Sequence, residues 1–297
     1  MCKCRRITGY CAGLNVHDMS DTKKLPFAED YWKQDGGQKW VELIDATESY
    51  LDVFNKMLFE RADIATGESV LDIGCGGGLT SIELANRVGT EGRVMGVDIS
   101  PDILAVAGVR GRAVANLKFT EGDAATMHLE PGAFSLIFSR FGMMFFSDPV
   151  MAFSKLRNAL KPSGRMVFLC WRTFDENPWM KEPTQAVFEI LPPQDPPPQP
   201  DSPGPFSLGK KERIEYLLGA AGFKSIAIEA LDTGMSMGAL TDVVDYFMRM
   251  GPAAAVIADA ADEHQTAART VIREVLKRYE TDQGVITKAA AWIVTAV

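Results

Sequence analysis

The stretch that most constrains the fold is residues 70–85, VLDIGCGGGLTSIELA. Val70, Leu71 and Ile73 form a short apolar run that is typical of a buried parallel strand, and at Gly74 the run changes to a glycine-rich turn. Apolar residues then recur at helical spacing up to Gly89, where a helix of that length would end. A strand, a glycine turn and a helix N-terminus in this order form a pocket in which backbone N–H groups face a ligand. The stretch therefore predicts an α/β fold that binds a nucleotide-like molecule.

Details of the same turn distinguish between kinds of nucleotide site. A Walker-type phosphate loop needs a Lys followed by Ser or Thr at the helix start, and Gly78-Leu79-Thr80 supplies no Lys. A dinucleotide fingerprint needs glycines at its first, third and sixth positions, whereas the sixth position here is Leu79. We expect Asp72 inside the turn, where its carboxylate would oppose a pyrophosphate but attract a cation, directly or through water. The turn therefore favours a positively charged ligand without phosphate.

Three motifs follow one another along the chain, each at the expected end of a strand. They are Asp72–Gly78 (DIGCGGG), Gly96–Ser100 (GVDIS) and Gly122–Ala124 (GDA). Together they resemble the class I S-adenosylmethionine-dependent methyltransferases, most closely the small-molecule branch that includes the ubiquinone/menaquinone-biosynthesis type enzymes. The resemblance is strong over roughly residues 68–171. It implies a doubly wound, Rossmann-like α/β fold, with a seven-stranded, mostly parallel sheet, helices on both faces, and N-terminal helices and a late helical insertion as a lid.

This resemblance also predicts the domain organisation. We expect a disordered or extended segment over residues 1–30 and a single methyltransferase domain over residues 31–297. Its expected parts are lid helices at 31–66, a cofactor-binding core at 67–171, a Pro-rich loop at 172–206, and a C-terminal half at 207–297 with a helical insertion at 240–282. Cys2, Cys4, Cys11 and His17 lack the paired spacing of zinc ligands, so no metal site is predicted.

Composition limits the partners. A net charge of −8 and a pI near 5.1 argue against nucleic acid, whose binding needs clustered Lys and Arg. No apolar run approaches the length of a membrane span, and the five cysteines are too scattered for a disulfide framework. We therefore expect a cytoplasmic monomer or homodimer that acts on a small molecule.

The second and third motifs predict contacts to the cofactor. Asp98 closes the strand over residues 93–97, where a carboxylate can accept hydrogen bonds from both ribose hydroxyls, while Ser100 caps the next helix. The resemblance implies that Asp123 binds the exocyclic amine of adenine and that Ala124 offers a backbone N–H. The expected fourth strand covers residues 134–139, and Arg140 follows it, so we expect Ser139 and Arg140 beside the methionine end. The predicted cofactor residues are Asp72, Gly74, Cys75, Gly76, Asp98, Ile99, Asp123, Ala124, Ser139 and Arg140.

Candidates for the acceptor site are apolar and come from three segments. Tyr31 and Trp40 lie on the expected lid helices, Phe141 and Met144 follow the fourth strand, and Phe247 lies in the late insertion. Packing in the core would explain any of them equally well. Of the four residues Met143, Met144, Phe145 and Phe146 we expect two in the core.

The predicted activity is transfer of a methyl group from S-adenosylmethionine to a small apolar or aromatic molecule, leaving S-adenosylhomocysteine. The sulfonium makes the methyl group electrophilic, so holding donor and acceptor in line and excluding water supply most of the catalysis. No motif marks His17, His128 or His264 as a base, so no catalytic residue is predicted. The alternatives are a nicotinamide-dependent oxidoreductase and a non-catalytic binding protein of the same fold.

Overall fold

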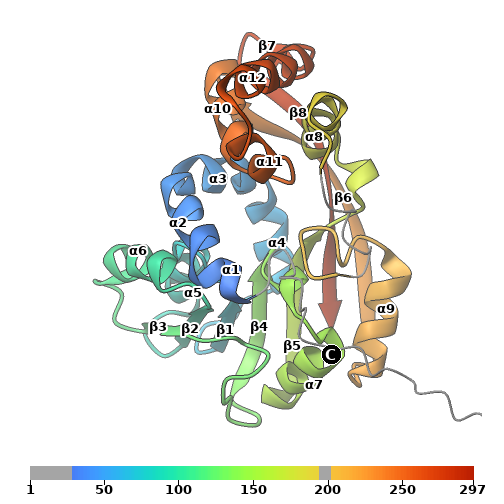
Figure 1. The fold of residues 1–297 in the computed structure, drawn as a ribbon. Coiled ribbons are helices and arrows are strands. Elements are labelled where there is room, and N and C mark those ends of the chain that lie inside the picture. Colours follow the sequence, from blue (N-terminus) through green and yellow to red (C-terminus); the bar gives the residue numbers. More distant parts are fainter. Residues whose placement is uncertain (1–28, 194–201) are drawn as a thin grey trace, which may run out of the picture.

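The computed structural model describes residues 29–193 and 202–297, with a single sheet at its centre (Figure 1). The strands are β1 (Ser69–Ile73), β2 (Arg93–Asp98), β3 (Leu117–Glu121), β4 (Phe134–Arg140), β5 (Leu160–Trp171), β6 (Ile226–Gly238), β7 (Glu280–Thr281) and β8 (Gly284–Ala296). Their order is β3-β2-β1-β4-β5-β8-β6, with the short β7 paired to β8. β1 to β5 pair in parallel, whereas β8 is antiparallel to β5 and β6. The predicted seven-stranded, mostly parallel sheet is confirmed, with β7 as an added eighth strand.

Helices cover both faces of this sheet, because successive side chains of each buried strand point to opposite faces. One face carries α4 (Asn55–Ala62), α5 (Leu79–Val88) and α6 (Pro101–Gly111), and Phe59 of α4 stacks on Phe138 of β4 with 5.2 Å between ring centroids. The other carries α7 (Pro149–Ala159) and α9 (Lys211–Ala220), and Phe153 of α7 stacks on Phe168 of β5 at 6.0 Å. The doubly wound arrangement is therefore confirmed.

The lid helices predicted at 31–66 are several short helices. They are α1 (Glu29–Lys33), α2 (Asp35–Glu42) and α3 (Ile44–Leu51), with a 3₁₀ turn η1 (Asp52–Phe54) before α4. Gly36 and Gly37 lie buried inside α2, where a Cβ at Gly37 would come within 2.2 Å of Ser100 Oγ. These glycines let α2 lie directly on the N-terminus of α6. The predicted segment 1–30, with Cys2, Cys4, Cys11 and His17, lies outside the described residues except for its last two.

The expectation of a Pro-rich loop throughout 172–206 is wrong for its first half. That half contains a 3₁₀ turn, η3 (Phe174–Glu176), and a thirteen-residue helix, α8 (Pro178–Ile190). Pro178 occupies the first turn of α8, where a missing N–H costs nothing, and buried side chains such as Trp179 and Val187 hold the helix in place. The prolines are concentrated after residue 191, and residues 194–201 lie outside the described part of the chain.

Four helices form what we call the helical cap: α8, α10 (Leu240–Arg249), α11 (Ala254–Ala258) and α12 (Asp262–Lys277). The last three lie between β6 and β8, within the insertion predicted at 240–282. β6 and β8 are each thirteen residues long. The two strands form a long ribbon that carries the cap above the carboxyl ends of the parallel strands (Figure 1).

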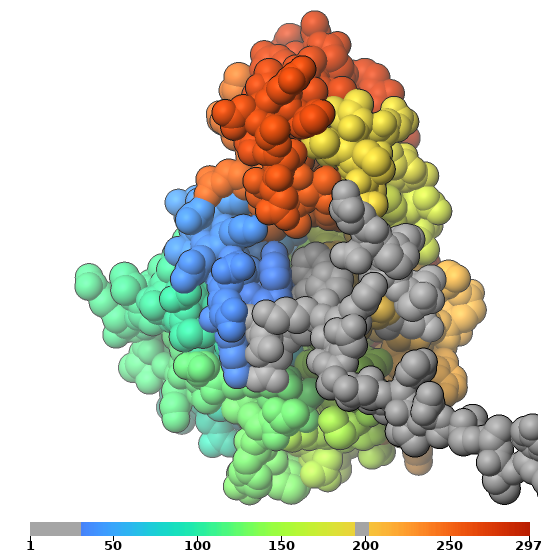
Figure 2. All heavy atoms as spheres, in the orientation of Figure 1, coloured from blue at the N-terminus to red at the C-terminus, as the bar shows by residue number. Residues whose placement is uncertain are grey.

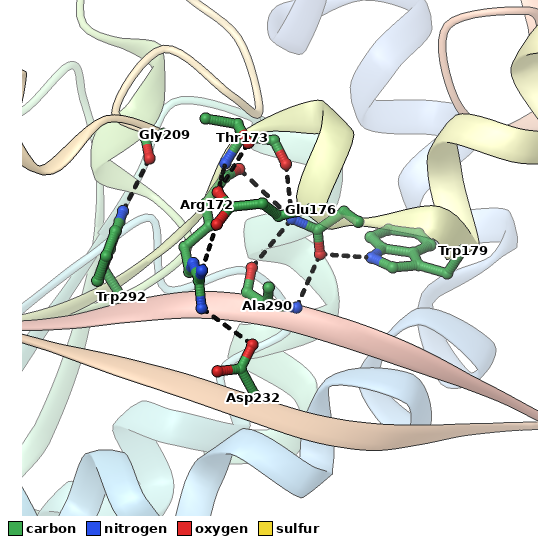
Figure 3. Close-up of polar contacts among 9 residues, drawn as sticks. Arg172, Thr173, Glu176, Trp179, Gly209, Asp232, Ala290 and Trp292 are labelled. Carbon is green, nitrogen blue, oxygen red and sulfur yellow. Dashed lines mark hydrogen bonds and ion pairs between the residues drawn. The ribbon is translucent and has the colours of Figure 1, made fainter.

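The junction between β5 and α8 is fixed by a dense set of polar contacts (Figure 3). The Asn177 side chain donates to Ala290 O at 3.0 Å, and its Oδ1 accepts from Ala290 N at 2.9 Å and from Trp179 Nε1 at 3.0 Å. Arg172 forms ion pairs with Glu176 and with Asp232 of β6. This junction therefore sets the position of Trp171 and Trp179, at the last residue of β5 and the start of α8.

Candidate functional site

The glycine-rich turn between β1 and α5 has the backbone that the sequence predicts. Gly74, Gly76 and Gly78 have φ values of 62°, 55° and 85°, in the left-handed region that favours glycine. A Cβ on Gly74 would also lie 2.8 Å from Gly142 Cα, so the turn after β1 and the turn after β4 are in close contact. The two turns therefore lie together at the carboxyl edge of the sheet.

Asp72 lies inside β1 and not in the turn, which corrects its predicted position. Its carboxylate is fully buried, and Oδ2 accepts hydrogen bonds from Thr80 Oγ1 at 2.8 Å and Ser81 Oγ at 2.6 Å. Within the described part of the chain, Oδ1 has no hydrogen-bond partner. Burial raises the pKa of Asp72 to about 6, and the two hydroxyls oppose this shift only in part. A buried carboxylate oxygen without a donor is a suitable partner for a cationic or N–H group of a ligand.

Asp98 ends β2 and binds the glycine turn. Its Oδ2 accepts from Gly76 N at 2.9 Å, and its Oδ1 accepts from Ser100 N at 3.0 Å. Burial raises the pKa of Asp98, while these backbone donors lower it. Ser100 caps α6 by accepting from Ile103 N, and Pro101 takes the first helical position, as predicted. Because a carboxylate offers about four acceptor positions, the Asp98 oxygens still have capacity for two hydroxyl donors.

Cys75 and Ile99 flank these groups, and the backbone of Cys75 is hydrogen-bonded within the protein. Cys75 N donates to Val97 O at 3.1 Å, and Cys75 O accepts from Gly78 N at 3.0 Å. Burial raises the pKa of the Cys75 thiol, and Asp98 and Asp72 raise it further. The thiol is therefore neutral and unsuited to nucleophilic chemistry. Ile99 is half-buried beside Asp98.

The third motif forms a turn beside the second. Asp123 Oδ1 accepts from Ala125 N at 2.8 Å, and its Oδ2 accepts from Thr126 Oγ1 at 3.3 Å. Gly122 N donates to Asp98 O at 3.0 Å, which brings the second and third motifs together. Ala124 is buried. Asp123 thus has a turn-forming role in this structure, and any contact with adenine would use its remaining acceptor capacity.

The residues at the end of β4 have distinct surroundings. Ser139 is buried, donates to Ile73 O at 2.7 Å and accepts from Gly142 N at 3.1 Å, so it fixes the two turns to each other. Arg140 Nη1 donates to Asn55 Oδ1 at 2.9 Å. Burial lowers the pKa of the Arg140 guanidinium, while the nearby carboxylates, Glu48 first and Asp72 second, raise it.

Aromatic rings extend from the end of β4 into the helical cap. Phe141 has a φ of 62°, unusual for a residue other than glycine, and its ring stacks on Trp171 with 4.1 Å between centroids. Trp171 contacts Trp179 at 5.1 Å, and Trp179 is followed by Phe247 at 6.3 Å. A strained backbone at a sheet edge that presents an aromatic ring is a feature of binding sites.

The remaining acceptor candidates divide between core and lid. Met143 and Met144 are buried, whereas Phe145 and Phe146 are half-buried, so two of the four are in the core as expected. Phe247 is also buried. Tyr31 is half-buried, and burial followed by the charge of Asp35 raises its pKa. Trp40 is half-buried, and its ring contacts Trp32 at 5.9 Å.

The structure thus brings Asp72, Gly74, Gly76, Asp98 and the third motif to one edge of the sheet. Sequence reasoning missed several residues of this edge: Glu48, Asn55, Arg110, Trp171 and Trp179. Trp171 could have been found, because it ends a predicted strand. The other four come from helices whose position against the turn no local pattern shows. No group of side chains that could hold a metal ion occurs within residues 29–193 and 202–297.

Comparisons with known proteins agree with this geometry. Residues 70–164 match a family described as a methyltransferase domain. Demethylmenaquinone methyltransferase of Staphylococcus aureus (strain MRSA252) is 30% identical over 139 residues, which cover 47% of this chain and 54% of that protein. The chain therefore spans about half the length of the curated relatives it matches.

Solved structures show the same fold. Phosphoethanolamine N-methyltransferase 2 of Haemonchus contortus, in complex with S-adenosyl-L-methionine, superimposes with a TM-score of 0.58 at 19% identity, over 92% of this chain and 60% of that chain. A putative methyltransferase of Bacillus halodurans superimposes with a TM-score of 0.55 at 18% identity, over 81% of this chain and 96% of that chain.

The strand order and the glycine turn define a Rossmann-like α/β fold of the methyltransferase type. Over residues 70–164 the chain is similar to a methyltransferase domain, and the curated relatives that it matches in part are demethylmenaquinone methyltransferases. Across the described residues, no helix has both the length and the apolar character that crossing a membrane requires.

Proposed function

We propose that this protein transfers the methyl group of S-adenosylmethionine to a small apolar or aromatic acceptor. The observation that carries the proposal is Asp72 Oδ1, a fully buried carboxylate oxygen without a donor, beside the glycine turn. S-adenosylmethionine carries an ammonium and a sulfonium but no phosphate. Its charges suit this carboxylate, whereas the pyrophosphate of a dinucleotide would be repelled by it.

The other cofactor contacts follow from the positions of the strand ends. Asp98 accepts the two ribose hydroxyls, and the peptide groups around Gly74, Cys75 and Gly76 face the methionine moiety. Arg140 is the last residue of β4, and we assign it to the carboxylate of the methionine moiety. Ile99, Asp123 and Ala124 border the adenine, while Ser139 acts indirectly, by holding the turn after β4 against β1.

The acceptor site is assigned to the aromatic residues above the ends of β4 and β5. Phe141 and Trp171 stack on each other there, with Trp179 of the cap next to them, and all three side chains are buried. Aromatic rings bind flat, apolar molecules through contact area and offset stacking. Tyr31 and Trp40, both half-buried, complete the proposed wall, whereas the other two candidates, Met144 and Phe247, are buried in the core.

The chain's own residues contribute position and exclusion of water rather than acid–base chemistry. When bound, S-adenosylmethionine supplies an electrophilic methyl group on its sulfonium. Asp72 and Asp98 fix the donor, the aromatic residues fix the acceptor, and the N-terminal helices and the cap exclude water from the space between them. Of the described histidines, His128 is exposed and lies 2.8 Å from Glu130 Oε1, and neither it nor His264 is assigned a role in proton transfer.

Isothermal titration calorimetry with S-adenosylmethionine, S-adenosylhomocysteine and NAD tests the cofactor. We expect binding of the first two, and the variant Asp98→Asn should weaken both by at least about tenfold, because hydrogen bonds to a charged group contribute ~1.5–3 kcal/mol. Glu215→Gln, an exposed residue of α9, serves as the control. Binding of NAD alone would support the oxidoreductase alternative and refute the proposal.

Methyl transfer is tested separately from binding. Purified protein with methyl-labelled S-adenosylmethionine is offered demethylmenaquinone, as an aromatic acceptor, and phosphoethanolamine, as a charged one. We expect transfer to the aromatic acceptor class. Tight cofactor binding without transfer to any member of an extract of metabolites would leave the non-catalytic alternative as the better description.

A further inference from the structure

A buried ion pair holds the N-terminal helices against the glycine-rich turn between β1 and α5, which we call the cofactor turn. Glu48 of α3 is 7% exposed, and both of its oxygens accept from Arg110 Nη1 of α6, at 2.9 Å and 2.8 Å. The same Nη1 donates to Gly77 O in the glycine turn at 3.2 Å, and Arg110 Nη2 donates to Asp45 Oδ1 at 3.0 Å. One guanidinium thus joins a lid helix, a sheet helix and the turn itself. We call Glu48, Arg110 and the Gly77 carbonyl the clasp.

The clasp lies directly on the turn. A Cβ on Gly77 would come within 2.4 Å of Arg110 Nη1 and within 2.6 Å of Glu48 Oε1 and Ile44 Cδ1. A side chain at this position would therefore displace the ends of the Arg110, Glu48 and Ile44 side chains. This contact accounts for a glycine at position 77, the middle of the three consecutive glycines in DIGCGGG, although Gly77 itself does not have a positive φ.

The N-terminal helices α1 to α3, which we call the cover, are held at two other places. Gly37 of α2 rests on Ser100 at the start of α6. On the opposite side, Thr47 Oγ1 donates to Tyr246 Oη of the cap at 3.3 Å, and the rings of Tyr50 and Tyr246 are 5.1 Å apart. In Figure 2 the N-terminal helices (blue) accordingly lie directly below the cap (orange and red). The cover is therefore closed over the carboxyl ends of β1 and β2.

We propose that Glu48 and Arg110 are positioning residues, which hold α3 closed over the cofactor turn and must separate before the cofactor is exchanged. The inference rests on the proposed function, because it assumes that the cofactor binds at this turn. Separating the pair leaves a buried carboxylate without its partner, which is costly, so the closed state is strongly favoured. Loosening the pair should therefore speed release of the cofactor and its product more than it affects the methyl-transfer step.

The test uses two conservative variants of the full chain. Glu48→Gln keeps the shape but removes the charge, and Arg110→Lys keeps the charge but cannot reach Glu48, Asp45 and the Gly77 carbonyl together, as the planar guanidinium does. Dissociation of S-adenosylhomocysteine is followed by stopped-flow fluorescence, and KM for S-adenosylmethionine is measured separately from kcat. Lys211→Met, which breaks an exposed pair on α9, is the matched control.

We expect each variant to raise the dissociation rate and KM by at least about tenfold. The kcat should stay constant, or rise if product release limits turnover. The double variant should be no worse than the worse single one, because both remove the same contact. A merely structural pair would instead lower the melting temperature and the active fraction without changing the dissociation rate of the folded protein.

Three results separate the possible failures. If the unaltered protein binds no S-adenosylhomocysteine, the proposed function is wrong. If it binds the ligand but both variants, folded by circular dichroism, release it at the rate of the control, the clasp does not hold the cover and the inference is wrong. Strictly additive effects in the double variant would also refute it, because they would show that the two residues act independently.

Discussion

Replacing Asp72 by Asn should make the ligand-free protein more stable at neutral pH and weaken cofactor binding. The pKa of Asp72 rises from 3.8 to about 6 because the carboxylate is buried. A shift of about two units, at about 1.4 kcal/mol per unit, corresponds to about 3 kcal/mol by which the ionised form disfavours folding. Asp72, whose ionisation has this cost, belongs to the candidate site, and its Oδ1 has no donor within the described chain.

The pH dependence follows from the sign of the shift. Because the pKa is raised in the folded state, the stability contributed by protonated Asp72 is fully present below pH 3.8 and is lost as the pH rises to about 6. Asn does not titrate, so its advantage over Asp should grow by about 3 kcal/mol between about pH 4 and pH 7. Asn can keep one oxygen for Thr80 and Ser81, so the packing around the site is preserved.

Urea unfolding followed by tryptophan fluorescence measures this difference, at several pH values and without ligand. Taking Asp72→Asn minus the unaltered protein at each pH cancels the titration of all other groups. A difference that is flat between pH 4 and pH 7 would refute the assigned cost of ionisation. Calorimetry then identifies the recognised group: loss of affinity for S-adenosylmethionine and S-adenosylhomocysteine alike indicates the shared ammonium, whereas loss for the former alone indicates the sulfonium.

Two further predictions concern the junction of β5 with α8 and the aromatic wall. Asn177→Ala should lower the free energy of unfolding by about 3 kcal/mol in thermal or urea unfolding, because Ala290 and the indole of Trp179 lose buried hydrogen-bond partners; a loss below about 1 kcal/mol would contradict this. Phe141→Leu should lower kcat/KM for an aromatic acceptor by about tenfold, since it removes the ring stacked on Trp171, and should leave the cofactor Kd unchanged. An equal loss for both ligands would instead place Phe141 at the cofactor.

Two features of the site, the position of Asp98 and the cap of α6, follow directly from local sequence. Asp98 was predicted at the end of a strand. It ends β2 because the apolar residues before it are buried in the interior of the sheet. Ser100 was predicted to cap the next helix, and its hydroxyl starts α6, with Pro101 at the first helical position, by capping geometry that needs only neighbouring residues. Such features are encoded within a few residues, so one sequence suffices to predict them.

Other features depend on residues that are distant in the chain. Arg110 follows Glu48 by 62 residues, and Ala290 follows Asn177 by 113, and neither pair has a spacing that a local pattern could reveal. Asp72 was predicted in the turn, whereas it lies in β1. The end of a strand depends on pairing with neighbouring strands, and β1 pairs as far as Ile73. Helix α8 was overlooked because the prolines that follow it dominated the composition.

The sequence by itself therefore determined the sheet, the glycine turn and the acids at the strand ends, because backbone geometry and apolar periodicity act over short distances. Only the tertiary structure decided which carboxylate oxygen lacks a donor, that Phe141 has a left-handed backbone, and that the N-terminal helices close on the turn. These properties arise when packed elements exclude water from particular atoms. Exclusion of this kind belongs to the whole fold and not to any one segment.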